Sequence, residues 1–406
     1  MQHRRFGRTE LDMPVFSTGG MRYQDGWADK PLDQLNPATT DNMEAVIRHS
    51  LSFGINHIET AKGYGPSERQ LGAVFDRIRA DHPRESYILQ TKAGPPHTGK
   101  EFLANLDGQL KRLRTDYIDL FGMHGLNTHE LIERTLKPGG ALEAARQAQK
   151  DGKIRHIGFS THAPLPVLLD AIDAQGDAFG GFDYVNLHHY FIYQRNEPAV
   201  AAATARDMGV FIISPTDKGG RLWDPAPELV EFCEPLHPIV FNDLWCLKDE
   251  RVHTLSLGAA RTSDYDLHLE AVEKLDQADE LTAPVELRLK NAMRTATGHA
   301  SPEAIVFDGV PEWYENEHGI NAPIMMWLRN LAAGWGMDEY GKMRFGLLGK
   351  GDHYFPGISG ADAEKLTDAQ LADLFRRSPH AAELPGLLRD AIDRLGGVEA
   401  KRLSAS

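Results

Sequence analysis

The chain of 406 residues is poor in cysteine and in net positive charge. Its two cysteines, Cys233 and Cys246, are too few for a disulfide framework or for a four-thiolate zinc or iron–sulfur site. Its net charge of −14 argues against a general nucleic-acid or anionic-membrane surface, because those partners select for basic patches. We therefore expect ordinary reduced thiols and no nucleic-acid partner.

Long hydrophobic runs are missing as well. No apolar stretch reaches the roughly 18 residues that cross a bilayer, and the opening segment MQHRRFGRTELDMP lacks the apolar stretch of a secretory signal. The hydrophobic fraction of 41% and the charged fraction of 25% are those of a globular protein, which excludes disordered and fibrous classes. We expect a cytoplasmic protein with no membrane partner.

Eight short apolar or β-branched runs recur along the first two-thirds of the chain, and each precedes a segment with helical periodicity. They are residues 15–18, 55–60, 87–92, 117–124, 156–161, 184–189, 210–215 and 253–259. This alternation predicts parallel βαβ units, and the chain is long enough for a barrel of about 250 residues plus a further region. The expected fold is an α/β parallel (β/α)8 TIM barrel.

Both ends of the chain depart from this alternation. Residues 2–6 and 11–15 flank the polar turn GRTE, which predicts an N-terminal β-hairpin plugging one end of the barrel. After about Glu280 the strand signal fades, so we predict a barrel domain over residues 1–284 and a helical C-terminal extension over residues 285–406.

Two helix starts are expected in this extension. Ser301 followed by Pro302 is typical of an N-cap and a first helical residue, although no capping box forms there. Thr367 with Gln370 makes a complete capping box ahead of an apolar face.

Polar residues close three consecutive predicted strands. IETAKGYG supplies Glu59 and Tyr64, LQTKAG supplies Lys92, and LFGMHG supplies His124. In a parallel barrel the carboxyl ends of the strands meet at one rim, where active sites lie. These four groups suit carbonyl reduction, because hydride addition leaves an alkoxide that must be protonated as it forms.

A role follows for each of the four. Tyr64 would donate the proton, and the Lys92 ammonium would lower the phenol pKa from its usual value of about 10. Glu59 would pair with Lys92 and keep it charged, while His124 would hydrogen-bond the carbonyl oxygen. The predicted catalytic residues are thus Tyr64, Lys92, Glu59 and His124.

The segments HIETAKGYGPSERQLG, LQTKAG and LFGMHG resemble those that carry the catalytic tetrad of aldo/keto reductases. The similarity extends through GFSTH to GAARTSDYDLHLEAV and covers roughly residues 2 to 275. The resemblance implies NADPH-dependent reduction of an aldehyde or ketone, a small-molecule substrate. Glu59 departs from the family, which has an aspartate at this position.

The C-terminal extension resembles that of a bacterial branch of this family. Some members of that branch carry cysteine clusters for iron–sulfur centres in it. Residues 281–406 of this chain contain no cysteine, so a thiolate-bound cluster there is excluded.

The resemblance also implies the cofactor residues. Gly19 and Gly20 would let backbone approach the nicotinamide ribose closely, and Met21 follows them. The nicotinamide carboxamide would be held by Ser160, Thr161 and Asn186, the last two of which replace the family's asparagine and glutamine. Ile213 stands where the family often has a tyrosine that stacks on the nicotinamide.

The phosphates of the cofactor would lie along two later loops. In SPTDKGGR the candidates for the pyrophosphate are Ser214, Lys218 and Arg221. After the eighth strand, the helix-start amides and the guanidinium form a seat for a phosphate monoester, which favours NADPH over NADH. This second set is Gly258, Arg261, Thr262 and Ser263. No Gly-x-Gly-x-x-Gly fingerprint follows the first strand, which disfavours a Rossmann dehydrogenase.

Two other classes remain open. A metal-dependent barrel hydrolase is suggested by histidines near strand ends, namely His124, His156, His162, His188 and His189. Against it, the first strand lacks the usual His-x-His pair, so no metal site is expected. A nicotinamide-binding regulatory protein with little turnover is left open by Glu59 and Ile213.

Overall fold

The computed structural model describes residues 1–22, 26–174, 179–350 and 355–397, which divide into two compact units. The first unit holds Met1–His189, Asn196–Thr216 and Cys246–Leu275. The second holds Tyr190–Arg195, Asp217–Trp245 and the described residues from Asp276 onward. Besides the C-terminal extension, the second unit thus includes three segments that the sequence predicted to belong to the barrel domain, namely Tyr190–Arg195, Asp217–Trp245 and residues 276–284.

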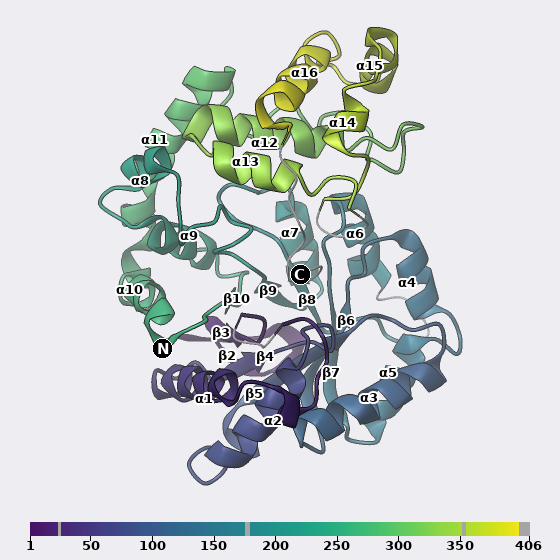
Figure 1. Ribbon diagram of the computed structural model, residues 1–406, viewed down its shortest axis with the longest axis vertical. Helices are drawn as coiled ribbons and strands as arrows, with labels where there is room; N and C mark the ends of the chain where they lie inside the picture. Colours follow the sequence, from purple (N-terminus) through teal and green to yellow (C-terminus); the bar gives the residue numbers. More distant parts are fainter. Residues whose placement is uncertain (23–25, 175–178, 351–354, 398–406) are drawn as a thin grey trace. The chain divides into compact units, whose positions relative to one another are not determined.

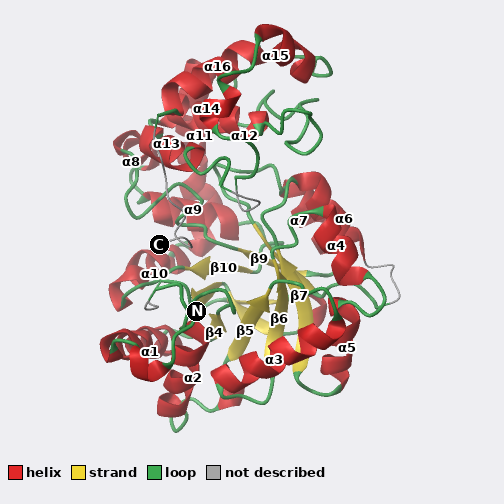
Figure 2. Ribbon diagram, turned by 45° about the vertical axis from the view of Figure 1, so that its right-hand side comes forward, coloured by secondary structure: helices red, strands yellow, loops and turns green. Residues whose placement is uncertain are grey.

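The first unit contains a closed barrel of eight parallel strands, as predicted (Figures 1 and 2). In spatial order the strands are β10 (Thr254–Leu257), β3 (Phe16–Gly19), β4 (His57–Glu59), β5 (Ile88–Ala93), β6 (Ile118–His124), β7 (Ile154–Ser160), β8 (Tyr184–Leu187) and β9 (Gly209–Ile212). Each strand lies within or next to one of the eight apolar runs, because β-branched and apolar residues suit strands covered on both faces.

Helices of the first unit surround the barrel (Figure 2). They are α1 (Pro37–Ser52), α2 (Ser67–Ile78), α3 (Gly99–Leu113), α4 (His129–Leu136), α5 (Ala141–Lys150), α6 (Leu165–Asp173), α7 (Glu197–Ala205) and α10 (Asp266–Glu273). The side chain of Asn36 caps α1, which buries Met43, Val46 and Ile47. Gly54 follows its end with a φ of +79°, a conformation that glycine adopts without strain.

The predicted N-terminal hairpin is present. Strands β1 (His3–Arg5) and β2 (Asp12–Pro14) pair antiparallel, and the adjacent Phe6 is fully buried. A side chain on Gly209 would come within 2.6 Å of the Phe6 ring, so glycine is required there. Phe6 packs with Ile88, the first residue of β5, which places the hairpin at the amino ends of the strands, opposite the predicted site.

Side chains alternate between the two faces of β5. Lys92 contacts Glu59 of β4 inside the barrel, whereas its neighbour Thr91 hydrogen-bonds Glu68 of α2 on the outside. This alternation is a property of every strand. The interior is unusually polar, since His57 and Gln90 are fully buried within it.

The second unit is helical. Its helices are α8 (Pro227–Cys233), α11 (Ala278–Thr297), α12 (Ala322–Trp335), α13 (Asp338–Phe345), α14 (Gly360–Ala363), α15 (Asp368–Phe375) and α16 (Leu384–Leu395), and α9 (Pro238–Leu247) contains a boundary between the units. Two buried tryptophans anchor α12, because Trp327 donates to the Ile192 carbonyl at 2.8 Å and Trp335 to that of Leu289 at 2.9 Å.

One of the two expected helix starts in the extension is present. Thr367 and Gln370 form a complete capping box at the start of α15. The prediction of a helix starting at Ser301 was wrong, because residues 301–309 form a bend and successive turns. The Ser301 hydroxyl accepts a hydrogen bond from Glu303 only two residues on, and Ile305 has a left-handed φ of +62°. These features fold the segment back before a helix forms.

Candidate active site

The four predicted catalytic side chains converge at the carboxyl ends of β4, β5 and β6. Glu59 is the last residue of β4, Lys92 lies in β5, and His124 is the last residue of β6. Nζ of Lys92 lies 5.4 Å from the centroid of the Tyr64 ring. The Tyr64 and His124 rings meet edge to face, with centroids 5.8 Å apart. A small group of acid, base and phenol therefore lines one rim.

A tight turn after β4 positions Tyr64. The amide of Tyr64 donates to the Ala61 carbonyl at 3.0 Å, and that of Ser67 donates to the Tyr64 carbonyl at 3.1 Å. Gly65 supplies the positive φ of +53° that this turn requires. The Lys62 amide bonds the Lys92 carbonyl at 2.8 Å, which ties the turn to β5. Tyr64 and Lys92 are thus held together by backbone as well as by side chains.

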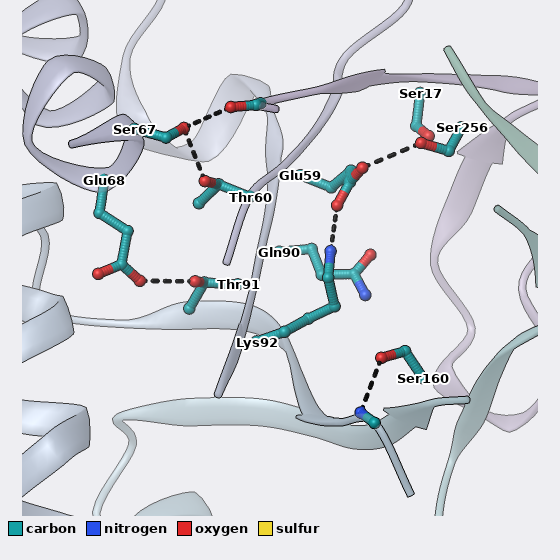
Figure 3. A network of polar contacts seen from close by, with 12 residues as sticks. Ser17, Glu59, Thr60, Ser67, Glu68, Gln90, Thr91, Lys92, Ser160 and Ser256 are labelled. Carbon is teal, nitrogen blue, oxygen red and sulfur yellow. Dashed lines mark hydrogen bonds and ion pairs between the residues drawn. The ribbon is translucent and has the colours of Figure 1, made fainter. Parts of the chain in front are cut away.

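The carboxylate of Glu59 and the ammonium of Lys92 form a buried ion pair (Figure 3). Only 5% of Glu59 and 2% of Lys92 is exposed, so each charge depends on the other. The Ser256 hydroxyl of β10 donates to Oε1 of Glu59 at 2.9 Å, while Oε2 faces Lys92. The sequence analysis did not identify Ser256. Ser256 could have been found from its position, because it is a polar residue near the carboxyl end of a predicted strand, two residues before Gly258.

The pKa of Tyr64 is raised above its usual value, first by removal of the phenol from water and second by the negative charge of Glu59. The expected lowering by Lys92 was therefore wrong. Lys92 is paired with Glu59, which offsets its charge, and its Nζ lies nearest the face of the ring. Tyr64 keeps its proton throughout the neutral pH range.

A second buried group lies below the ion pair, toward the amino ends of the strands. Burial, and after it the charge of Lys92, lowers the pKa of His57 to about 3. A side-chain hydrogen bond with Gln90 opposes this lowering but does not outweigh it. His57 is therefore a neutral imidazole at neutral pH, and it adds no charge beneath Lys92.

The predicted carboxamide residues differ in their availability. Oδ1 and Nδ2 of Asn186 are both buried, and neither has a hydrogen-bond partner in the described part of the chain. A buried amide in this state is costly unless a complementary donor and acceptor meet it, and a nicotinamide carboxamide offers both. Ser160 accepts from the Gly125 amide at 3.3 Å, and the Thr161 hydroxyl donates to the Leu126 carbonyl at 2.7 Å. Asn186 fits the cofactor best, whereas Thr161 is already engaged.

The glycine at position 20 has a structural explanation. A side chain on Gly20 would come 2.8 Å from the Ser67 hydroxyl and 2.9 Å from the Glu59 carbonyl. Packing within the barrel thus already requires glycine there. Met21 follows it and is partly exposed. Ser214, after β9, has a φ of +54°, a strained value for serine that is more frequent at functional sites.

The loop after β10 has the expected helix start. A 3-10 turn over Thr262–Tyr265 leads into α10. The Arg261 guanidinium is 77% exposed and pairs with Asp264 at 2.9 Å, and the same carboxylate accepts from the Ala260 amide at 2.8 Å. Gly258 and Ser263 are exposed beside this turn. An exposed guanidinium is thus present, but a carboxylate occupies part of the predicted phosphate seat.

Lys218 and Arg221 lie in the second unit. Arg221 forms an ion pair with Asp224. Burial, and after it the charge of Arg344, lowers the pKa of Lys218 to about 7. Arg344 also pairs with Asp217 at 3.0 Å.

Of the histidines near strand ends, His162 and His188 come together. Nδ1 of His162 and Nε2 of His188 share a hydrogen bond, and their rings stack with centroids 4.7 Å apart. Across the described ranges, no three His, Cys, Asp or Glu side chains converge in a group that could hold a metal ion. In the same ranges, no helix is both long enough and apolar enough to cross a membrane.

The phenol, the imidazole and the buried acid–base pair lie at the carboxyl ends of the strands, where the active sites of parallel barrel enzymes lie. The sequence model of the "Aldo/keto reductase family" matches residues 16–219. That range contains all four tetrad candidates. The chain belongs to the aldo/keto reductase family.

Similar proteins agree with this assignment. The L-glyceraldehyde 3-phosphate reductase of Escherichia coli O157:H7 is 25% identical in an alignment 354 positions long, which covers 72% of this chain and 95% of that protein. The L-galactose dehydrogenase of Arabidopsis thaliana is 28% identical over 54% of this chain and 72% of its own length. An aldo-keto reductase structure from Bacillus halodurans, in its holo form, aligns with a TM-score of 0.57 at 20% identity. It covers 71% of this chain and 96% of that one and supports the fold.

Proposed function

We propose that this protein reduces an aldehyde or ketone to the alcohol with NADPH and that Tyr64 donates the proton. The observation that carries the proposal is the placement of Tyr64 beside both Lys92 and His124 at the carboxyl rim of the barrel. The bound cofactor would supply the hydride. The chain itself must therefore orient the carbonyl group and deliver a proton to its oxygen.

The raised pKa of Tyr64 keeps the phenol protonated, so it can hydrogen-bond a carbonyl oxygen before reaction. His124 would donate a second hydrogen bond and fix the direction of that oxygen. As negative charge grows on the oxygen, the Tyr64 proton moves to it, which leaves the phenolate beside the Lys92–Glu59 ion pair. Glu59 holds Lys92 in place through their buried ion pair. The chemistry thus rests on four side chains from three successive βα segments.

Residues for the cofactor follow from the same proposal. Asn186 would hold the nicotinamide carboxamide, assisted by Ser160, because its buried amide atoms have no partner among the described residues. Arg261 would bind the 2′-phosphate that distinguishes NADPH from NADH, since its guanidinium is largely exposed. The test compares the Kd values for NADPH and NADH in the native protein and in Arg261→Ala. A native preference for NADPH of tenfold or less that Arg261→Ala leaves unchanged would contradict this assignment.

The two curated relatives are named for a phosphorylated hydroxyaldehyde and for a sugar. We therefore propose that the substrate is a short hydroxyaldehyde or an aldose. A panel of such compounds, with unsubstituted aldehydes as comparison, tests this by NADPH oxidation.

Tyr64→Phe tests the mechanism. Loss of the only hydroxyl of this side chain should lower kcat by about a thousandfold or more, within the range of general acid catalysis. NADPH binding, measured by fluorescence, should change little. Tyr87→Phe is the matched control, because Tyr87 stacks on Phe75 away from the site. Retained activity in Tyr64→Phe would remove Tyr64 from the proposed role.

One observation favours the second candidate function, a nicotinamide-binding regulatory protein. The buried amide of Asn186 would bind a nicotinamide carboxamide whether or not Tyr64 transfers a proton, because neither of its polar atoms has a partner among the described residues. Tight NADPH binding without oxidation across the whole aldehyde panel would support this candidate over the enzyme.

A further inference from the structure

The buried side chain of Glu59 needs support at both oxygens of its carboxylate. It has one more rotatable bond than an aspartate side chain would have. It is also 5% exposed, so both carboxylate oxygens require donors from the protein. Lys92 serves Oε2 only. The second oxygen depends on a group outside the four tetrad candidates.

Ser256 is that group. Its hydroxyl donates to Oε1 of Glu59 at 2.9 Å, and it is itself 8% exposed. The two residues are not on adjacent strands, because β3 lies between β4 and β10. The contact crosses β3 at Gly19, which pairs with Glu59 in the strand register.

Gly19 makes this contact possible. A Cβ there would lie 2.9 Å from the Leu257 carbonyl of β10, which by itself requires glycine. It would also lie 3.0 Å from Oε1 of Glu59 and 3.3 Å from the Ser256 hydroxyl. Those distances are tighter than ordinary van der Waals contact, and the added carbon would offer Oε1 no hydrogen. The space that Gly19 leaves open is filled by the end of the longer glutamate.

We propose that Ser256 is a positioning residue for the reduction: through the opening at Gly19 it fixes Oε1 of Glu59, so that Oε2 holds Lys92 beside Tyr64. This inference rests on the proposed function for its effect on turnover. The contact itself does not. Glutamate at position 59, glycine at position 19 and serine at position 256 then act as one set.

The chain offers a matched control in Ser17. Ser17 pairs with Ser256 in the register of β3 and β10 and lies beside it in Figure 3. It is fully buried, but its hydroxyl donates to the Leu255 carbonyl at 3.3 Å. Ser17→Ala therefore removes a buried hydroxyl of the same strand pair without removing a donor to Glu59.

The test is a double-mutant cycle of Ser256→Ala and Glu59→Asp in the full chain, with NADPH and the best aldehyde of the panel. Ser256→Ala should lower kcat about tenfold, as expected for losing a hydrogen bond to a charged group, and leave KM nearly unchanged. In the Glu59→Asp background, whose shorter side chain does not reach Ser256, the same substitution should cost less than about twofold. Ser17→Ala should stay within about twofold of the native kcat.

Equal losses from Ser256→Ala in both backgrounds would overturn the inference, and so would an equal loss in Ser17→Ala. The urea unfolding midpoints of the native chain, Ser256→Ala, Glu59→Asp and the double variant give a readout that needs no turnover. Ser256→Ala should lower the midpoint of the native chain but not that of Glu59→Asp. If the midpoints are coupled while the native chain reduces no carbonyl, the proposed function fails and the positioning contact stands. Uncoupled midpoints together with uncoupled kcat values overturn the contact itself.

Discussion

Two buried glutamates lie on opposite sides of β5. The partners of one lie beside the candidate active site, and the partners of the other join strands to helices. Glu59, inside the barrel, is held by Lys92 and Ser256. Glu68, outside it, accepts from Thr91 at 2.7 Å and is 2% exposed. Figure 3 shows both clusters with Thr91 and Lys92 adjacent on the strand.

The outer cluster reaches the backbone of the inner one, because the Gln109 amide donates to the Lys92 carbonyl at 3.5 Å. Gln109 and Arg112 of α3 also donate to the Glu68 carboxylate, each at 2.7 Å. Its charge and hydrogen bonds join α2, α3 and β5. In the inner cluster the Lys92 ammonium also faces the Tyr64 ring. The same kinds of group thus hold the barrel together on one face of β5 and serve chemistry on the other.

The strongest test of this comparison replaces each carboxylate by its amide. Glu59→Gln should lower kcat at least about a hundredfold, because Lys92 loses the charge that holds it beside Tyr64. Glu68→Gln should leave kcat of the folded enzyme within about twofold. It should instead lower the free energy of unfolding by about 3 kcal/mol, since Arg112 loses its buried partner. Steady-state kinetics and urea unfolding measure the two effects. A large kcat loss in Glu68→Gln would show that the two clusters are not separate.

A smaller effect is expected in the pH dependence of the unfolding free energy, to which His57 on the inner face contributes. His57 lies on the inner face with its pKa lowered to about 3, while the unfolded value is near 6.5. As the pH falls below 6.5, the unfolded chain takes up a proton that folded His57 refuses, so stability is lost. His57→Gln should therefore lose about 2 kcal/mol less unfolding free energy than the native chain between pH 7.5 and 5. Parallel pH dependences in the two proteins would contradict the assigned burial cost.

The smallest effect is expected for a substitution at Thr91, which belongs to the outer cluster but precedes Lys92 in β5. Thr91→Val removes one donor to Glu68 and keeps the shape of the side chain. It should lower the unfolding free energy by about 1 kcal/mol, the usual worth of a single hydrogen bond. The kcat should stay within about twofold, although Lys92 is the next residue. A tenfold change in kcat would mean that the outer cluster helps to position Lys92.

The barrel and much of its rim were predictable because they depend on short contiguous segments. Each strand and its following helix carry their own periodicity, and the carboxyl ends of parallel strands must share one edge. Glu59, Tyr64, Lys92 and His124 each close or follow such a strand, so their convergence followed from the topology alone. The Thr367 capping box was equally local and equally readable. Ser301 shows the limit, since the turns that follow it override its cap.

What the sequence by itself determined is therefore the barrel, the order of its strands and the rim on which its polar residues gather. Only the tertiary structure decided that Ser256 meets Glu59, because residues 197 positions apart in the chain are joined there through a gap at Gly19. It also reversed the expected direction of the Tyr64 pKa, since burial and the Glu59 charge outweigh a lysine that is already paired. Local patterns are written in neighbouring residues, whereas desolvation and long-range contacts exist only once the barrel has closed.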